Sequence, residues 1–184
     1  MKIFNTLSGK KENFVPIEKN KIKMYVCGMT VYDDTHIGHA RTFLSFDLIV
    51  RYLRNINYEV QYIRNITDVD DKIISRAEEL DVTPKELTEK YIGSMNDDFR
   101  SLGMIEPDSE PRATDNIDSI ISLIEILIRK GHAYEGNSDV YFAAESFDSY
   151  GKLSRRNLED TLAGARVDID KDKQNPADFV LWKK

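Results

Sequence analysis

The sequence predicts an α/β fold in which helices flank a parallel sheet. Two strand-like segments, 23–27 and 58–63, stand on either side of a segment with helical periodicity. Their starts lie ~30 residues apart, which is the size of a right-handed βαβ unit with parallel strands. The chain has 184 residues, of which 41% are hydrophobic and 32% charged. That length suits one folded domain, or one domain with a small insertion.

The first helix is expected from about His39 to Ile56, and a second from about Lys72 to Leu80. The first carries one apolar stripe at helical spacing, which consists of Ile37, Ala40, Leu44, Leu48, Ile49, Tyr52, Leu53 and Ile56. An acidic run at 68–71 precedes the second helix. It lacks the glycine and the distant glutamate of a calcium loop, so we expect carboxylates that begin a helix rather than a metal site.

A third helix is expected to begin at Thr83. Thr83 is placed as the N-cap, Pro84 as the first helical residue, and Glu86 as the partner that completes a capping box. The buried stripe of this helix is predicted to be Leu87, Tyr91, Met95, Phe99 and Leu102. Gly103 ends the helix, and residues 106–111 follow as a proline-bounded loop.

The last third of the chain changes in character. A fourth helix is expected from about Asn116 to Lys130, with Gly131 as its terminator. Its inward residues are predicted to be Ile117, Ile120, Ile121, Ile124, Leu127 and Ile128. Residues 133–142 then predict a hairpin with its turn at 136–138. The chain is charged and irregular from Tyr150 onward and ends in a strand-like apolar run.

Charge and composition exclude several classes of protein. A formal net charge of −6 gives no basis for non-specific nucleic-acid binding, although a local basic patch is still able to contact RNA. One cysteine excludes an intrachain disulfide and is typical of a reducing cytoplasm. The segment 1–11 lacks the apolar run of a signal peptide, and no stretch approaches the ~18–20 apolar residues of a membrane span. We therefore expect a cytoplasmic protein with no membrane partner.

The chemistry concentrates where the first strand leads into the first helix, at His36-Ile37-Gly38-His39. Histidines three apart at a helix start lie on one face, and both imidazoles can donate N–H groups to phosphate oxygens beside the positive helix end. Gly38 has no side chain, so a flat base can lie against the backbone. The pattern indicates binding of a nucleoside triphosphate and displacement of pyrophosphate. The alternative is two surface histidines that cap a helix by chance.

Cys27 and three small residues end the two strands. A lone cysteine is usually a small buried hydrophobe, and zinc needs about four ligands, so the residues alone leave the role of Cys27 open. Gly28, Thr30 and Thr67 lie at strand ends, where ligands of open α/β sheets bind. Ordinary turn chemistry explains these three equally well.

These segments resemble the signatures of cysteinyl-tRNA synthetases. The two main stretches are YVCGMTVYDDTHIGHART at 25–42 and RNITDVDDKI at 64–73. Further stretches at 111–114, 130–134, 163–168 and 178–183 are similar to the same family. The resemblance runs from Lys2 to Lys183, and the combination of motifs is highly specific.

The resemblance implies an α/β fold of the class I synthetases. Residues 1–130 are then the first half of a Rossmann-type, HUP-like nucleotide-binding catalytic domain with a parallel sheet. Residues 131–184 are the start of an inserted α+β connective domain. The implied enzyme is a cysteine–tRNA ligase, which activates cysteine with ATP and magnesium to cysteinyl-adenylate and then charges tRNA(Cys).

The family's functional residues carry over to matching positions. The resemblance assigns catalysis to His36 and His39, ATP binding to His36, Gly38 and His39, cysteine binding to Gly28, Thr30 and Thr67, and zinc binding to Cys27. A soft thiolate is a strong zinc ligand, whereas the hydroxyl of serine is a poor one at neutral pH. Zinc therefore discriminates cysteine from serine strongly enough to make an editing site unnecessary.

The chain also departs from the family pattern. The other zinc ligands, the second signature Lys-Met-Ser-Lys-Ser and the anticodon-binding region are absent. We therefore expect the N-terminal part of the enzyme, which does not charge tRNA by itself. Three other functions stay open: a mycothiol-pathway cysteine ligase, a nucleotidylyltransferase, and a non-enzymatic truncated paralogue. The first two share the H-x-G-H site, but only the ligase shares the zinc–thiol chemistry.

Overall fold

The computed structural model describes residues 1–155 and 172–183. The chain divides into two compact units, one of residues 15–117 and one of residues 1–14 together with 118–184. The similar stretch at 163–168 lies outside the described residues. Every helix in the described ranges is too short or too polar to cross a lipid bilayer.

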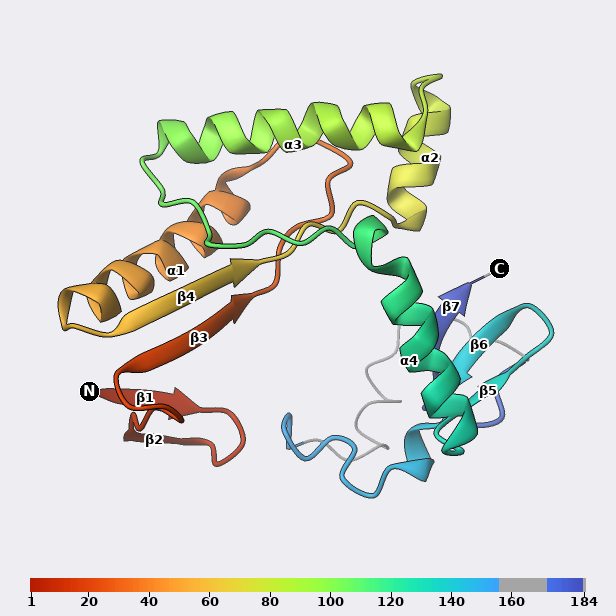
Figure 1. The fold of residues 1–184 in the computed structure, drawn as a ribbon. Coiled ribbons are helices and arrows are strands. Elements are labelled where there is room, and N and C mark those ends of the chain that lie inside the picture. The colour runs from red at the N-terminus through yellow and green to blue at the C-terminus, as the bar shows by residue number, and fades with distance from the viewer. Residues whose placement is uncertain (156–171, 184) are drawn as a thin grey trace. The chain divides into compact units, whose positions relative to one another are not determined.

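A βαβ unit organises residues 15–117. Strands β3 (Lys21–Val26) and β4 (Glu59–Arg64) pair in parallel, from Lys21 opposite Glu59 to Val26 opposite Arg64. Helix α1 (Ile37–Asn55) connects them and packs against β4 (Figure 1). Both predicted strands and their parallel pairing are confirmed, and the α/β class with them. The helix begins at Ile37 rather than His39, because His36 caps it.

The loop at 106–111 extends this sheet. The Arg64 N–H donates to the carbonyl of Ser109 at 3.1 Å, and the Ile66 N–H donates to that of Pro111 at 2.9 Å. Isolated parallel bridges join Ile63 to Ser109 and Ile66 to Arg112. Proline has no N–H, so Pro111 cannot donate to a sheet ladder. The predicted loop is therefore correct. Its end lies beside β4 and is joined to it by single backbone hydrogen bonds rather than by a regular strand.

Helix α1 buries a different face from the predicted one. Its buried residues are Phe43, Asp47, Val50 and Leu53. Of the predicted stripe only Leu53 is buried, whereas Ile37 is 86% exposed and Leu48 is 68% exposed. The prediction was wrong because α1 carries apolar side chains on two faces. The sequence shows apolar residues at helical spacing on both faces of α1. Which face is buried depends on how α1 packs in the fold, including its contact with β4.

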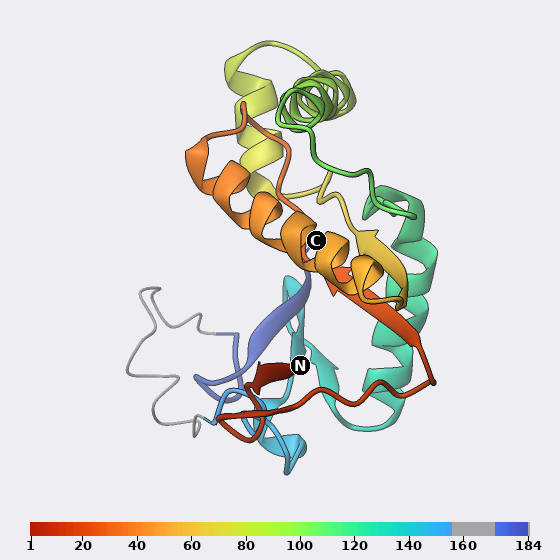
Figure 2. The ribbon, with the colours of Figure 1, turned by 90° about the vertical axis from the view of Figure 1, so that its left-hand side faces the viewer.

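Helices α2 (Asp71–Glu79) and α3 (Pro84–Ser101) pack against each other (Figure 2). Asp70 caps α2 and accepts the Lys72 N–H at 2.9 Å, so part of the acidic run begins a helix, as predicted. The capping box of Thr83 and Glu86 is confirmed at the start of α3. Four predicted stripe residues are buried, namely Leu87, Tyr91, Met95 and Phe99, whereas Leu102 is the C-cap and is 48% exposed.

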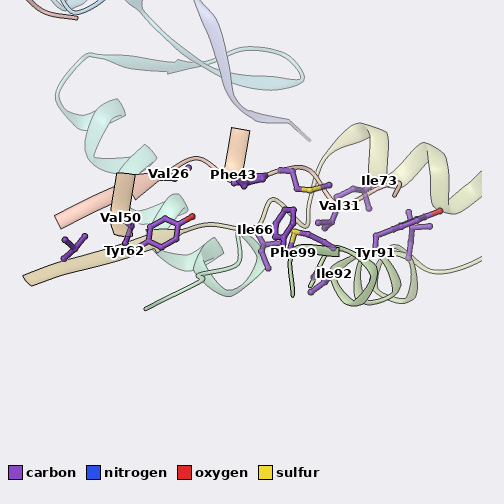
Figure 3. Packing of buried hydrophobic residues seen from close by; sticks show 14 of the residues in the cluster. Val26, Val31, Phe43, Val50, Tyr62, Ile66, Ile73, Tyr91, Ile92 and Phe99 are labelled. Carbon is purple, nitrogen blue, oxygen red and sulfur yellow. The ribbon is translucent and has the colours of Figure 1, made fainter. Parts of the chain in front are cut away.

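The core of this unit joins the sheet to the helices. Figure 3 shows Val26, Val31, Phe43, Ile66 and Phe99 among its packed side chains. Val31 and Ile66 belong to the connections that leave β3 and β4, so the strand ends are anchored by packing as well as by backbone pairing. This anchoring holds the strand ends in place where the predicted site residues begin.

The described residues of the second unit form two antiparallel sheets. Strands β1 (Lys2–Asn5) and β2 (Lys10–Asn13) form a hairpin that the polar sequence did not predict. Strands β5 (Ala133–Glu135), β6 (Asp139–Phe142) and β7 (Phe179–Lys183) pair in that order. The predicted hairpin at 133–142 and the strand-like final run are thus confirmed.

Helix α4 (Ile117–Arg129) lies close to its predicted bounds. The short helix η1 (Thr114–Asn116) precedes it, and η2 (Ala144–Ser146) follows β6. Of its predicted inward residues only Ile124 is fully buried, and Ile121 is 39% exposed. Ile117, Ile120, Leu127 and Ile128 are half-buried, so the predicted inward face of α4 is confirmed except at Ile121.

Candidate active site

A cavity of about 360 Å³ lies where β3 leads into α1. The predicted site residues Cys27, Gly28, Thr30, His36 and His39 line it. Gly38 and Thr67 are not among its lining residues. The remaining lining residues are Met29, Tyr32, Asp33, Asp34, Thr42, Phe43 and Lys72. The βαβ connection therefore brings the thiol and both imidazoles to one cavity.

The two histidines form the N-terminal cap of α1. The Nδ1 atom of His36 accepts the Gly38 N–H at 3.0 Å, and the Nδ1 atom of His39 accepts the His36 N–H at 3.3 Å. Their rings stack with centroids 3.9 Å apart and an interplanar angle of 21°. Since Nδ1 accepts in both rings, the proton of each neutral imidazole is on Nε2. Within residues 1–155 and 172–183, no hydrogen bond uses the Nε2–H donor of either ring, so both can point to a ligand.

The charge of His39 is controlled by its surroundings. Burial lowers the pKa of His39, and the positive charge that His36 can carry lowers it further. His39 is therefore neutral at neutral pH, and its Nδ1 atom stays available as the acceptor of the helix cap. The imidazole acts here as a hydrogen-bond donor through Nε2 rather than as a cation.

The lowered pKa of His39 predicts a loss of stability in acid. Between the folded pKa and the unfolded value of about 6.5, the unfolded state binds more protons, so the free energy of unfolding falls as the pH falls through this window. Above about pH 6.5 this contribution is constant. Urea denaturation at pH 7.5 and 5.5 is the measurement. His39→Gln is the control, because glutamine at this position keeps the capping box. If the free energy of unfolding fell by the same amount between pH 7.5 and pH 5.5 in both proteins, that result would contradict the prediction.

Gly38 leaves room for the imidazole of His36. A Cβ atom at Gly38 would lie 2.8 Å from Cε1 and 2.9 Å from Nδ1 of His36, which is too close. The glycine thus permits the side chain of His36 to fold back onto the first turn of α1. The contact with adenine that the sequence predicts for Gly38 stays a prediction.

Asn65 joins the ends of the two strands. Its Oδ1 atom accepts the Gly28 N–H at 2.7 Å, and its Nδ2 atom donates to Oγ1 of Thr67 at 3.3 Å. A Cβ atom at Gly28 would lie 1.6 Å from the backbone oxygen of Asn65, so only glycine fits there. Thr67 in turn exchanges backbone hydrogen bonds with Met29 and Val31 at 3.2 Å. Asn65, which the sequence did not single out, thus joins Gly28 to Thr67, and an isolated parallel bridge joins Thr67 to Thr30.

Cys27 has an exposed, free thiol at the end of β3. In residues 1–155 and 172–183, no group of three or more histidine, cysteine, aspartate or glutamate side chains can hold a metal ion. The residues present therefore do not make a complete zinc site. Cys27 is exposed and lines the cavity, and its role as a zinc ligand stays a prediction.

Four other cavity residues were missed as site residues: Tyr32, Asp33, Asp34 and Lys72. Asp34 accepts a hydrogen bond from Oγ of Ser94 at 2.9 Å, which ties the loop before α1 to α3. The first three lie in the polar lead-in to the histidines, and that proximity was the available signal. Lys72 lies in α2, far from the histidines in sequence, and the available signal was its place in the second similar stretch, 64–73.

The chain is similar to known proteins along its whole length. Residues 13–184 match the family of tRNA synthetases class I (C) catalytic domain. A cysteine–tRNA ligase of Marinomonas sp. (strain MWYL1) is 57% identical over 184 residues, and one of Pasteurella multocida (strain Pm70) is 59% identical over 184 residues. In both cases the match covers 100% of this chain and 40% of the relative. The chain thus spans about 40% of the length of these curated relatives.

Solved structures share the fold. A ternary complex titled LeuRS-tRNA-LeuAMS from Agrobacterium radiobacter K84 matches with a TM-score of 0.56 and 23% identity, over 66% of this chain and 16% of that one. A putative arginyl tRNA synthetase from Campylobacter jejuni matches with a TM-score of 0.51 and 15% identity, over 68% of this chain and 38% of that one. At these identities the likeness concerns the fold alone.

Proposed function

This chain belongs to the family of class I (C) tRNA synthetase catalytic domains, and we propose that it supplies the cysteine- and ATP-binding corner of a cysteine–tRNA ligase. The resemblance to cysteinyl-tRNA synthetases is confirmed by relatives of that name that match the whole chain. One observation carries the proposal for the site. The thiol of Cys27 and the paired imidazoles of His36 and His39 share one cavity at the end of a βαβ unit.

The first step activates the amino acid. The carboxylate of cysteine attacks the α-phosphorus of ATP, a new P–O bond forms, and the bond to the bridging oxygen breaks so that pyrophosphate leaves. His36 and His39 present Nε2–H donors to the charge that develops on the phosphate oxygens. The α1 N-terminus adds the partial positive charge of its dipole. In the proposal the adenine lies near the backbone of Gly38, as the sequence predicts. ATP enters as its magnesium complex.

The second step transfers the amino acid. A ribose hydroxyl at the 3′ end of tRNA(Cys) attacks the carbonyl carbon of cysteinyl-adenylate, an ester forms, and AMP leaves. Gly28, Thr30 and Thr67 lie near the cysteine in this proposal, which the hydrogen bonds of Asn65 to Gly28 and Thr67 support. These residues position the amino acid for both attacks.

Zinc needs more ligands than the described residues offer. In the proposal Cys27 is one zinc ligand, and the remainder of a full-length ligase supplies the others. Bound zinc would hold the substrate's thiolate and reject the hydroxyl of serine. The proposal further places the first half of the nucleotide-binding domain at 1–130 and the start of the connective domain at 131–184. It also predicts that the 184-residue chain does not charge tRNA by itself.

A chimera tests this function. Residues 1–184 of this chain replace the matching segment of the Pasteurella multocida relative, which shares 59% identity. We expect ATP–pyrophosphate exchange that depends on cysteine, followed by charging of tRNA(Cys). Serine in place of cysteine is the control and is expected to react ~10⁴-fold more slowly. A folded chimera without cysteine-dependent exchange would sink the proposed function. Robust exchange by the 184-residue chain alone would overturn its predicted inactivity.

A further inference from the structure

The cavity has an unusual charge balance for a site that binds a polyphosphate. Asp33 and Asp34 contribute carboxylates to its lining, whereas His39 is neutral because burial lowers its pKa. Among the described residues that line the cavity, Lys72 is the one lysine or arginine. A triphosphate next to two carboxylates needs a positive charge nearby, and the neutral imidazole of His39 supplies a hydrogen bond instead.

Lys72 is held at the cavity by an aromatic ring. Its Nζ atom lies 5.5 Å from the ring centroid of Tyr32, within the range of a cation–π interaction, and Tyr32 also lines the cavity. In the described part of the chain, no carboxylate forms an ion pair with Nζ of Lys72. An ammonium over a ring face keeps its N–H donors available for a ligand.

Helix stability does not account for Lys72. The residue lies in the first turn of α2, where its backbone N–H is bound by the cap Asp70. A cation near a helix N-terminus opposes the helix dipole, and acidic residues such as Asp71 are the favourable choice there. The same positive helix end attracts a phosphate. The position and the positive charge of Lys72 are therefore favourable for binding an anion and unfavourable for the stability of α2.

We propose that Lys72 is a substrate-binding residue that contacts the triphosphate of ATP. This inference rests on the proposed function and extends it, since the α1 cap supplies hydrogen-bond donors and Lys72 supplies a full positive charge. As pyrophosphate departs, negative charge grows on it, and the ammonium stabilises that charge. Lysine suits this task because it acts as a point charge toward phosphate.

The test uses the chimera with Lys72→Met, Lys72→Arg and a matched control. Lys90→Met is that control, because Lys90 also lies over a ring, 4.9 Å from the centroid of Tyr91, but does not line the cavity. Lys72→Met should raise the KM for ATP about 10- to 100-fold and change the KM for cysteine less than about 2-fold. Lys72→Arg should keep the KM for ATP close to that of the parent chimera. Lys90→Met should change neither the KM for ATP nor the KM for cysteine.

The outcomes separate this inference from the proposed function. An active chimera in which Lys72→Met leaves the KM for ATP unchanged, or raises the KM for cysteine instead, overturns the role of Lys72 and leaves the proposed function intact. An inactive parent chimera counts against the proposed function. In that case ATP titration of the 184-residue chain decides the role of Lys72, with circular dichroism to verify the fold. Weaker binding by Lys72→Met supports the role, and equal binding refutes it.

Discussion

Replacement of Glu110 by alanine is expected to lower the free energy of unfolding by about 3–5 kcal/mol. Oε1 of Glu110 accepts from Nε of Arg64 at 2.7 Å, and the side chain of Arg64 is only 5% exposed. The guanidinium lies 5.2 Å from the ring centroid of Phe43 and 4.8 Å from that of Phe99. Figure 3 labels both rings in the packed core. The variant would leave this buried cation without its carboxylate, which is far costlier than the loss of an exposed ion pair.

Urea denaturation measures this effect, with two comparisons. The double variant Arg64→Met with Glu110→Leu removes both charges and should recover most of the loss, since apolar residues of similar size replace buried pairs at little cost. Asp97→Ala removes an exposed partner of Arg100, a pair whose side chains are 77% and 68% exposed, and should cost less than about 1 kcal/mol. A Glu110→Ala protein as stable as Asp97→Ala would show that Arg64 finds other partners or water.

His36→Asn in the chimera is expected to reduce kcat for ATP–pyrophosphate exchange by about 10²- to 10³-fold while the fold stays stable. Asparagine is a good N-cap, so its side-chain oxygen can accept the Gly38 N–H that Nδ1 of His36 accepts now. The free energy of unfolding should then change by only a few tenths of a kcal/mol. The Nε2–H donor is lost, and with it one contact to the developing phosphate charge. Exchange kinetics and urea denaturation of the same preparation measure both.

His36→Ala provides the comparison for that variant. It removes the donor and the cap together, so activity should fall as in His36→Asn while stability also falls by about 1 kcal/mol. If His36→Asn retained full exchange activity, the histidine would serve α1 alone. The imidazole would then be a structural cap rather than a contact to ATP.

Much of the fold follows from local sequence patterns. The alternation at 58–63 and the ~30-residue spacing between strand starts predicted the parallel pair β3 and β4. Thr83, Pro84 and Glu86 predicted the start of α3, because a capping box is complete within four residues. The pattern at 36–39 likewise predicted two histidines on one face, and their rings do stack. Apart from the spacing of the two strands, each of these signals lies within one turn or one strand.

Burial depends on partners that are distant in sequence, and no local pattern contains them. Helix α1 has two apolar faces, and the face with Phe43, Val50 and Leu53 is the buried one because α1 packs against β4 and the ring of Phe43 packs against that of Phe99 in α3. The irregular edge at 108–113 and the burial of Arg64 also depend on backbone pairing after α3.

The same distinction holds for the candidate site. The sequence by itself determined the family, the βαβ unit and the histidine pair, because their motifs are contiguous. Only the tertiary structure placed Lys72 at the cavity and Asn65 between the strand ends. Both residues follow β4, and the parallel pairing of β4 with β3 brings them to the end of β3 where Cys27 and Gly28 lie. That pairing joins chain segments nearly 40 residues apart, as the Asn65–Gly28 hydrogen bond across 37 positions illustrates.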